Sequence, residues 1–286
     1  MAFLLFPAML LACVGDSPVP DGGTPVDSGS DTSTSNDSGG CTSPQTLCTK
    51  GPQSLCTDIA TDDQNCGSCN NVCPTNTTCK SSKCVCSDTT KTLCGTTCLD
   101  AQTDPKNCGA CGHVCPNNDC TAGKCDPIVF VTNLPVATNL GGFGAYDAKC
   151  QSLAQTAGLS GTFMAWISQS TGNASSPSTR FAKSTRPYVL TDGTVVADSY
   201  SALTSGAALK HAINTSESKQ VFTQKNFVMT STNSSGNSQG GDCTGWTGVA
   251  PGGALGDLTT TTLAWSRDFS TTVDCTSVYQ IYCFEQ

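Results

Sequence analysis

The chain has 286 residues, a net charge of −8 and 21 cysteines, sixteen of which lie in residues 41–126. Cysteines this dense persist as disulfides only outside the reducing cytosol, so a cytosolic protein is excluded. The folded parts are nearly neutral, since five of the aspartates lie in residues 14–40, which carry no basic residue. This distribution leaves no basic stripe, and we therefore expect no nucleic-acid partner.

The first twelve residues, MAFLLFPAMLLA, are too few to span a bilayer as a helix but suit the apolar region of an export signal. The sequence Leu10-Leu11-Ala12-Cys13 resembles the bacterial lipobox, in which the cysteine is acylated and becomes the mature N-terminus. The resemblance implies a signal peptide over residues 1–12 and lipidation of Cys13, although the usual basic segment is missing. The alternatives are an ordinary secretory signal with a coincidental cysteine and a buried apolar segment.

Residues 13–40 follow the lipobox and consist mainly of Asp, Gly, Ser, Thr and Pro, without an aromatic residue. Such a segment cannot bury enough apolar surface to order itself, so we expect a disordered acidic linker. As a random coil it would span about 30 Å, which would hold the rest of the chain away from a membrane.

Two copies of a Cys-rich repeat are expected at residues 41–85 and 86–126. Their centres, DQNCGSCNNVCP and PKNCGACGHVCP, align without gaps. Each copy has eight cysteines and very few large apolar side chains, so disulfides have to supply the stability that a core cannot. We expect up to four disulfides in each copy, and the sequence does not choose among the connectivities.

Zinc is the alternative for the Cys-x2-Cys pairs inside these repeats. Each pair belongs to a larger, even-numbered array behind an export signal, and His113 is the only histidine nearby. We therefore expect no metal site.

The shared pattern Asn-Cys-Gly-x-Cys-Gly/Asn-x-Val-Cys-Pro resembles the stigma-specific protein family, whose modules recur in bacterial surface lipoproteins. That resemblance implies a rigid stalk and no activity.

Strand and helix patterns begin at residue 127. Helical spacing predicts a helix over residues 141–158, with Cys150 on its inner face and Gly158 as its C-terminal cap. The last ten residues, SVYQIYCFEQ, are largely apolar on both faces and predict a buried closing strand at 277–286. The other expected strands are 128–132, 162–168, 227–230 and a hairpin over 187–197 around Asp192-Gly193.

Four cysteines remain in residues 127–286, and a nested pairing is the economical one. Cys150–Cys283 would join the helix to the closing strand, and Cys243–Cys275 would lie inside that loop. A link that closes more than 100 residues stabilises by about 4–5 kcal/mol in the chain-entropy model. With sixteen cysteines in the repeats and Cys13 lipidated, every cysteine has a role.

A first helix and a last strand that share a disulfide, with a second pair between them, resemble the C-type-lectin-like fold in its endostatin-like branch. The segments GGFGAYDAKCQSLAQTAGLSGTFMAWIS, PYVLTDGTVVA and IYCFEQ are also similar to a domain family of unknown function in bacterial surface lipoproteins. The resemblance covers residues 127–286. It implies an α+β domain of C-type-lectin-like fold in the cell envelope, and it implies no activity.

Calcium-dependent carbohydrate binding is the first alternative that this fold raises. Calcium takes about six to eight oxygen ligands, and the lectin motifs Glu-Pro-Asn, Gln-Pro-Asp and Trp-Asn-Asp are missing here. Of the three tryptophans, Trp166 and Trp265 lie in apolar patterns and are expected in the core. Trp246 lies in a Gly/Thr-rich stretch and is the candidate ligand contact. The remaining candidate oxygen ligands are Asp257, Asp268, Asp274, Asn233 and Asn237.

A hydrolytic enzyme is the second alternative. His211 is the only histidine of the C-terminal domain, and its apolar neighbours predict a helix in which a lone histidine is structural. Gly-x-Ser-x-Gly, His-Glu-x2-His and phosphate-loop motifs are missing, so we expect no catalytic residue.

The sequence as a whole predicts an exported, membrane-anchored lipoprotein. It would display a C-type-lectin-like binding or adhesion domain on a disulfide-rich stalk, with an extracellular protein or glycan as its partner. Residue 14 is valine rather than the aspartate that retains some lipoproteins at the inner membrane, which favours a surface-exposed outer-membrane lipoprotein.

Overall fold

The computed structural model describes residues 40–50, 53–169, 173–248 and 252–286. The expected signal peptide, Cys13 and almost all of the acidic linker lie outside the described residues. Within the described ranges, no helix has the length and apolar character needed to cross a membrane.

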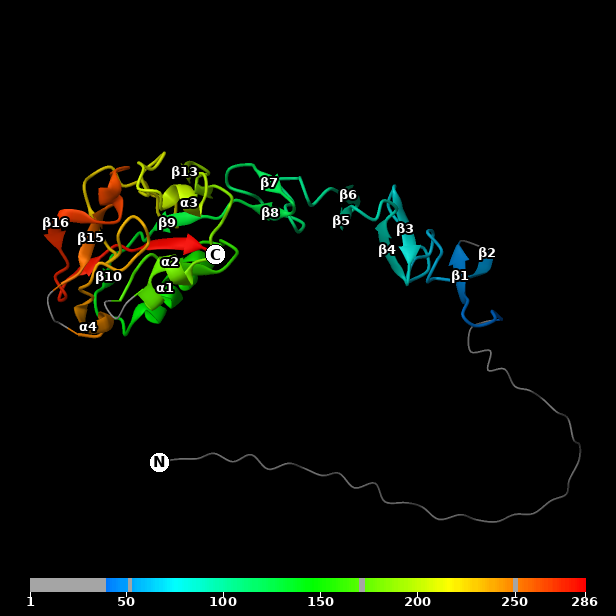
Figure 1. Ribbon diagram of the computed structural model, residues 1–286. Coiled ribbons are helices and arrows are strands. Elements are labelled where there is room, and N and C mark those ends of the chain that lie inside the picture. The colour runs from blue at the N-terminus through cyan, green and yellow to red at the C-terminus, as the bar shows by residue number, and fades with distance from the viewer. Residues whose placement is uncertain (1–39, 51–52, 170–172, 249–251) are drawn as a thin grey trace, which may run out of the picture.

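Each Cys-rich repeat consists of two short antiparallel strand pairs. The pairs follow one another along the chain and end at the C-terminal domain (Figure 1). In the first repeat the strands are β1 (Thr46–Lys50), β2 (Gln53–Thr57), β3 (Thr77–Lys80) and β4 (Lys83–Cys86). In the second repeat they are β5 (Thr92–Cys94), β6 (Thr97–Leu99), β7 (Cys120–Thr121) and β8 (Lys124–Cys125).

The two repeats have the same disulfide connectivity. In each, the first cysteine pairs with the third, the second with the fifth, the fourth with the seventh and the sixth with the eighth. The sequence left this choice open. The pairs are Cys41–Cys56, Cys48–Cys69, Cys66–Cys79 and Cys73–Cys84, then Cys86–Cys98, Cys94–Cys111, Cys108–Cys120 and Cys115–Cys125. Each repeat is therefore a covalently closed unit.

The C-terminal domain mixes short strands with few helices and is built around an antiparallel sheet of three strands in the order β11-β18-β9. These strands are β9 (Val129–Val131), β11 (Phe163–Ala165) and β18 (Tyr282–Glu285). The central strand is thus the last one in the chain. The long helix α1 (Phe143–Thr156) lies against β11 and β18 and buries Tyr146, Cys150 and Ala154.

Three further strand groups and several single-turn helices complete the domain. The strands are β10 (Val136–Ala137) with β17 (Val278–Tyr279), β12 (Tyr188–Val189) with β13 (Val195–Ala197), and β14 (Phe227–Met229), β15 (Ala254–Asp257) and β16 (Asp268–Thr272) in one sheet. The short helices are α2 (Pro177–Arg180), α3 (Tyr200–Leu203) and α4 (Cys243–Trp246), with 3₁₀ turns at Asn173–Ser175 and Leu263–Trp265.

The closing strand differs from the prediction, because it is two strands rather than one. β17 pairs with β10, whereas β18 joins the central sheet. Between them, the Gln280 carbonyl accepts a hydrogen bond from the Met229 backbone N–H at 2.9 Å. The chain therefore changes partners at Gln280, a break that an alternating pattern does not reveal.

The core of the domain contains both disulfides of the C-terminal domain on one side of β18 and a cluster of aromatic rings on the other. Cys150–Cys283 and Cys243–Cys275 are both present, as the nested pairing predicted, and the sulfur pair on α1 and β18 is fully buried. On the other face of β18, the ring of Phe284 lies 5.2 Å from that of Trp166 and 5.5 Å from that of Tyr188. Both faces of β18 are therefore packed.

Candidate functional site

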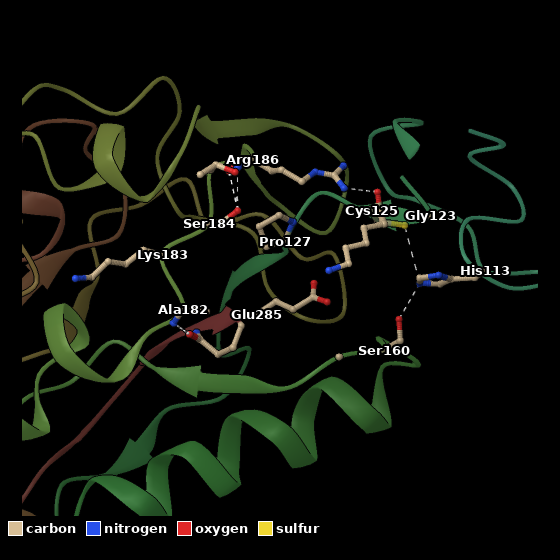
Figure 2. A pocket seen from close by; sticks show the side chains of 14 residues that line it. His113, Gly123, Cys125, Pro127, Ser160, Ala182, Lys183, Ser184, Arg186 and Glu285 are labelled. Atoms are coloured by element: carbon tan, nitrogen blue, oxygen red, sulfur yellow. Dashed lines mark hydrogen bonds between the residues drawn. The ribbon is translucent and has the colours of Figure 1, made fainter. Parts of the chain in front are cut away.

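A cavity of about 640 Å³ opens where the second repeat meets the C-terminal domain. We call it the junction cavity (Figure 2). The second repeat, the loop after α1, the segment before β12 and the end of β18 all contribute to its wall. Its ionisable and hydroxyl-bearing residues are His113, Lys124, Ser160, Lys183, Ser184, Thr185, Arg186 and Glu285.

Arg186 holds the second repeat against the C-terminal domain. Its Nε and Nη2 lie 2.9 and 2.7 Å from Oδ1 of Asp126, and its Nη1 donates to the backbone carbonyls of Thr121 and Lys124. Asp126 is only 2% exposed, and its other oxygen accepts a hydrogen bond from Asn117 at 2.6 Å. The carboxylate therefore depends on this one guanidinium for its counter-charge among the described residues.

Two glycines let backbones approach closely at this junction. Gly193, in the turn between β12 and β13, has a φ of +91°, and a Cβ there would lie 2.5 Å from the carbonyl oxygen of Pro116. Gly161 has a φ of +98°, and a Cβ there would lie 2.3 Å from Oε1 of Glu285. Gly193 is therefore fitted to the docked second repeat, whereas the close contact of Gly161 is with the Glu285 side chain inside the C-terminal domain.

His113 and Ser160 form a second link across the junction. Nδ1 of His113 lies 2.7 Å from the carbonyl oxygen of Cys108, so it carries the proton, and Nε2 accepts from the Ser160 hydroxyl at 2.9 Å. This is the spacing of a nucleophile and a general base. However, Nδ1 faces a carbonyl rather than a carboxylate, and Ser160 is exposed on a loop.

Glu285 is the acidic side chain of the junction cavity. Its Oε2 accepts a hydrogen bond from the Ile128 backbone N–H at 2.9 Å, and its carboxylate points into the cavity in Figure 2. Burial raises the pKa of Glu285 above its ordinary value, and the Ile128 hydrogen bond and His113 partly offset that rise. Within the part of the chain that the structure describes, Oε1 has no hydrogen-bond partner.

Lys124 brings the opposite charge to the same cavity from β8. Its side chain is exposed, and its ammonium group forms no ion pair or hydrogen bond with any described residue. The cavity is therefore lined by a carboxylate and an ammonium group that do not pair with each other.

Trp246, the predicted ligand contact, is not available for one. It is fully buried, its indole N–H donates to the carbonyl of Ser168 at 3.0 Å, and its ring meets Tyr146 edge-on. The prediction was wrong because Cys243, at the start of α4, is drawn into the core by its disulfide and takes Trp246 with it. Trp166 and Trp265 are buried, as expected.

The expected helix around His211 is also missing, since residues 207–213 form bends and irregular backbone. His211 is half-buried, and its Nδ1 lies 2.8 Å from the carbonyl oxygen of Ala212. The apolar residues on either side of His211 do not form one face of a helix. Leu209 and Ile213 pack into the core instead.

The candidate calcium ligands do not converge in the described ranges. Asp257 and Asp274 each accept hydrogen bonds from the backbone and hydroxyl of a threonine two residues on, and the Asn233 side chain closes a turn on Ser235 and Asn237. The side chain of Asp268 lies outside the described residues. Among the described residues, two sets of three side chains lie close enough together to hold a metal ion. They are Cys66, Cys73 and Cys84 in the first repeat, and Cys108, Cys115 and Cys125 in the second.

Every sulfur in these two groups belongs to a disulfide. Zinc binds thiolates, so it would first require reduction of the repeat.

A comparison with known protein families finds no family that matches the chain, and a comparison with curated proteins finds no similar sequence. Function has to be argued from the junction cavity itself.

Replacing Arg186 with alanine should destabilise the protein by about 3 kcal/mol. The change leaves Asp126 buried without a counter-charge, and the value lies at the low end for a buried pair because Arg186 is partly exposed. Urea unfolding of the oxidised protein measures it. Lys210→Ala is the matched control, since its exposed pair with Asp198 should contribute less than about 1 kcal/mol. Equal effects of the two variants would contradict the docking role.

Glu285→Gln should raise the melting temperature at pH 7. Because the pKa of Glu285 is raised in the folded state, its ionisation opposes folding above that pKa, and the penalty fades as the pH falls toward 4. The gain should therefore shrink over that interval, measured by thermal unfolding in matched buffers. Burial is the main cause of this penalty, and the Ile128 hydrogen bond and His113, which faces the same cavity, reduce it. A variant less stable than the parent at pH 7 and equal to it at pH 4 would contradict this account.

Proposed function

We propose that this protein is an exported lipoprotein that displays a binding or adhesion domain at the cell surface, with the junction cavity as its ligand site. The observation that carries the proposal is that the cavity is built jointly by the second repeat and the C-terminal domain. Arg186 and Gly193 fix the two parts against each other. Among the described residues, Oε1 of Glu285 and the ammonium group of Lys124 line the cavity without a partner.

We assign the C-terminal domain to the C-type-lectin-like fold, in its endostatin-like branch. Support comes from the disulfide that joins α1 to the last strand, with Cys243–Cys275 nested inside that loop. The antiparallel position of β18 between β9 and β11 brings the two ends of the domain together, as that fold requires. In this proposal the first repeat is a spacer, and the second repeat is part of the binding unit.

The order of segments supports the location. A lipobox ending in Cys13 would give an acylated N-terminus, and two or more acyl chains anchor a protein firmly where one does not. The acidic linker and the first repeat would then lift the binding unit off the outer membrane. All the cysteines of the described residues are in disulfides, which fits an oxidising compartment.

A hydrolytic enzyme is the second candidate, and the hydrogen bond between Ser160 and His113 is the observation that favours it. We rank it below binding because the hydroxyl is exposed and no carboxylate orients the imidazole. Calcium-dependent sugar binding ranks lower still, since the candidate oxygens are already used within their own turns.

Intact mass spectrometry of the non-reduced protein, purified from its membrane, tests the anchor. We expect a mature chain that begins at Cys13, carries the mass of its acyl groups and has ten disulfides. A Cys13→Ser variant should lose the acyl mass and appear in the soluble fraction. An unmodified Cys13 in the membrane-bound protein would contradict the lipoprotein proposal.

A screen of the oxidised protein against glycans and extracellular matrix proteins, with and without a calcium chelator, tests the binding function. We expect saturable binding that resists the chelator and is lost in a variant whose cavity is blocked, Ala182→Trp. An equally bulky change on the exposed surface, Ser152→Trp, is the control. Binding that the chelator abolishes would favour the lectin, and covalent labelling of Ser160 by a fluorophosphonate would favour the hydrolase.

A further inference from the structure

Glu285 and Lys124 suggest which ligand the junction cavity takes, an inference that rests on the proposed function. The two side chains line one cavity, and neither is paired with any described residue through the atoms that face it. We propose that the cavity binds a small zwitterion, with the ligand's ammonium group against the carboxylate of Glu285 and the ligand's carboxylate against the ammonium group of Lys124.

The position of Glu285 suits it to receive a cation. Its Oε2 is fixed by the Ile128 backbone N–H, and a Cβ at Gly161, which also lines the cavity, would lie 2.3 Å from Oε1. Oε1 is left to accept a hydrogen bond from the cavity side. A partly desolvated carboxylate gains more from a charged donor than from water, which favours an ammonium group there.

Lys124 is anchored through its backbone rather than through its charge. Its carbonyl accepts from Nη1 of Arg186, and the next residue, Cys125, is held by a disulfide to Cys115. The base of the side chain is thus fixed, while its ammonium group can move to meet a carboxylate.

The other charged and hydroxyl groups around the cavity are largely committed to partners. Arg186 pairs with Asp126, and His113 binds Ser160. The Ser184 hydroxyl donates to the carbonyl of Arg186 and accepts from its N–H. Lys183 points away from Glu285 in Figure 2. Glu285 and Lys124 are therefore the pair of charges best placed to recognise a ligand.

The wall of the cavity is largely apolar and includes Pro127, Ala182 and Cys125. A volume of about 640 Å³ lies in the range of small-molecule sites. A ligand that carries its two charges on an aliphatic chain would place that chain along this wall. The chemical class is thus an amino acid, with its chain length set by the distance between the two side chains.

Calorimetric titration of the oxidised full-length protein with a series of unbranched ω-amino acids, from glycine to 6-aminohexanoate, tests the inference. We expect one chain length to bind best, and butylamine and butyrate to bind at least about tenfold more weakly, since each loses one charged hydrogen bond. Glu285→Gln and Lys124→Met should each weaken the best ligand by about tenfold or more. Lys183→Met should leave its affinity unchanged.

Three outcomes would overturn the inference: no zwitterion binds, butylamine or butyrate binds as tightly as the best zwitterion, or Lys183→Met weakens binding as much as Lys124→Met. The binding function is judged separately. If a glycan or protein from the screen binds and Ala182→Trp blocks it, while no amino acid competes, the zwitterion inference fails and the proposed function stands. If neither class of ligand binds, both fail.

Discussion

The covalent link between α1 and β18 is the constraint on which the rest of the C-terminal domain depends. Cys150 and Cys283 are 133 residues apart in the chain, so their disulfide removes about 5 kcal/mol of chain entropy from the unfolded state. It holds the last strand between β9 and β11, where hydrogen bonds on both edges complete its pairing. Glu285 follows Cys283 by two residues, so the same link fixes the carboxylate of the junction cavity.

The Cys-rich repeats also depend on disulfides, but there the disulfides take the place of a hydrophobic core. They bury almost no large side chains, so each relies on four disulfides of one shared connectivity for its shape. The second repeat adds what the first does not have, namely Asp126 at its end and Pro116 against the turn at Gly193. The second repeat thereby forms one wall of the junction cavity.

Local patterns predicted much of the fold, because the signals involved span only a few residues. The cysteine spacing predicted both repeats, helical periodicity predicted α1 almost to its ends, and Asp192-Gly193 predicted the β12–β13 turn. Features set by contacts between distant segments were missed. The change of partner at Gln280 depends on β14, and the burial of Trp246 depends on the disulfide at Cys243.

The junction cavity could not be predicted for the same reason. Its charged residues come from segments up to about 170 residues apart and form no motif, so each alone is an ordinary surface Lys, His or Glu. One signal was available: Asp126 and Arg186 are charged residues that each lie shortly before a strand of a nearly neutral domain, β9 and β12. Charge is costly to bury there unless a partner is present.

The carboxylate of Glu285 is the feature that stability alone does not explain. A glutamine would keep the hydrogen bond to Ile128 and would avoid the burial that raises the pKa of the acid. The Arg186–Asp126 pair, by contrast, satisfies its own charges and needs nothing from outside. Glu285 opposes folding at neutral pH and faces a cavity lined by Lys124, whose ammonium group is unpaired among the described residues. A carboxylate in this position is explained where a ligand brings the missing charge. The same reasoning distinguishes the two acids of the junction: Asp126 holds the walls together, and Glu285 is left for what enters between them.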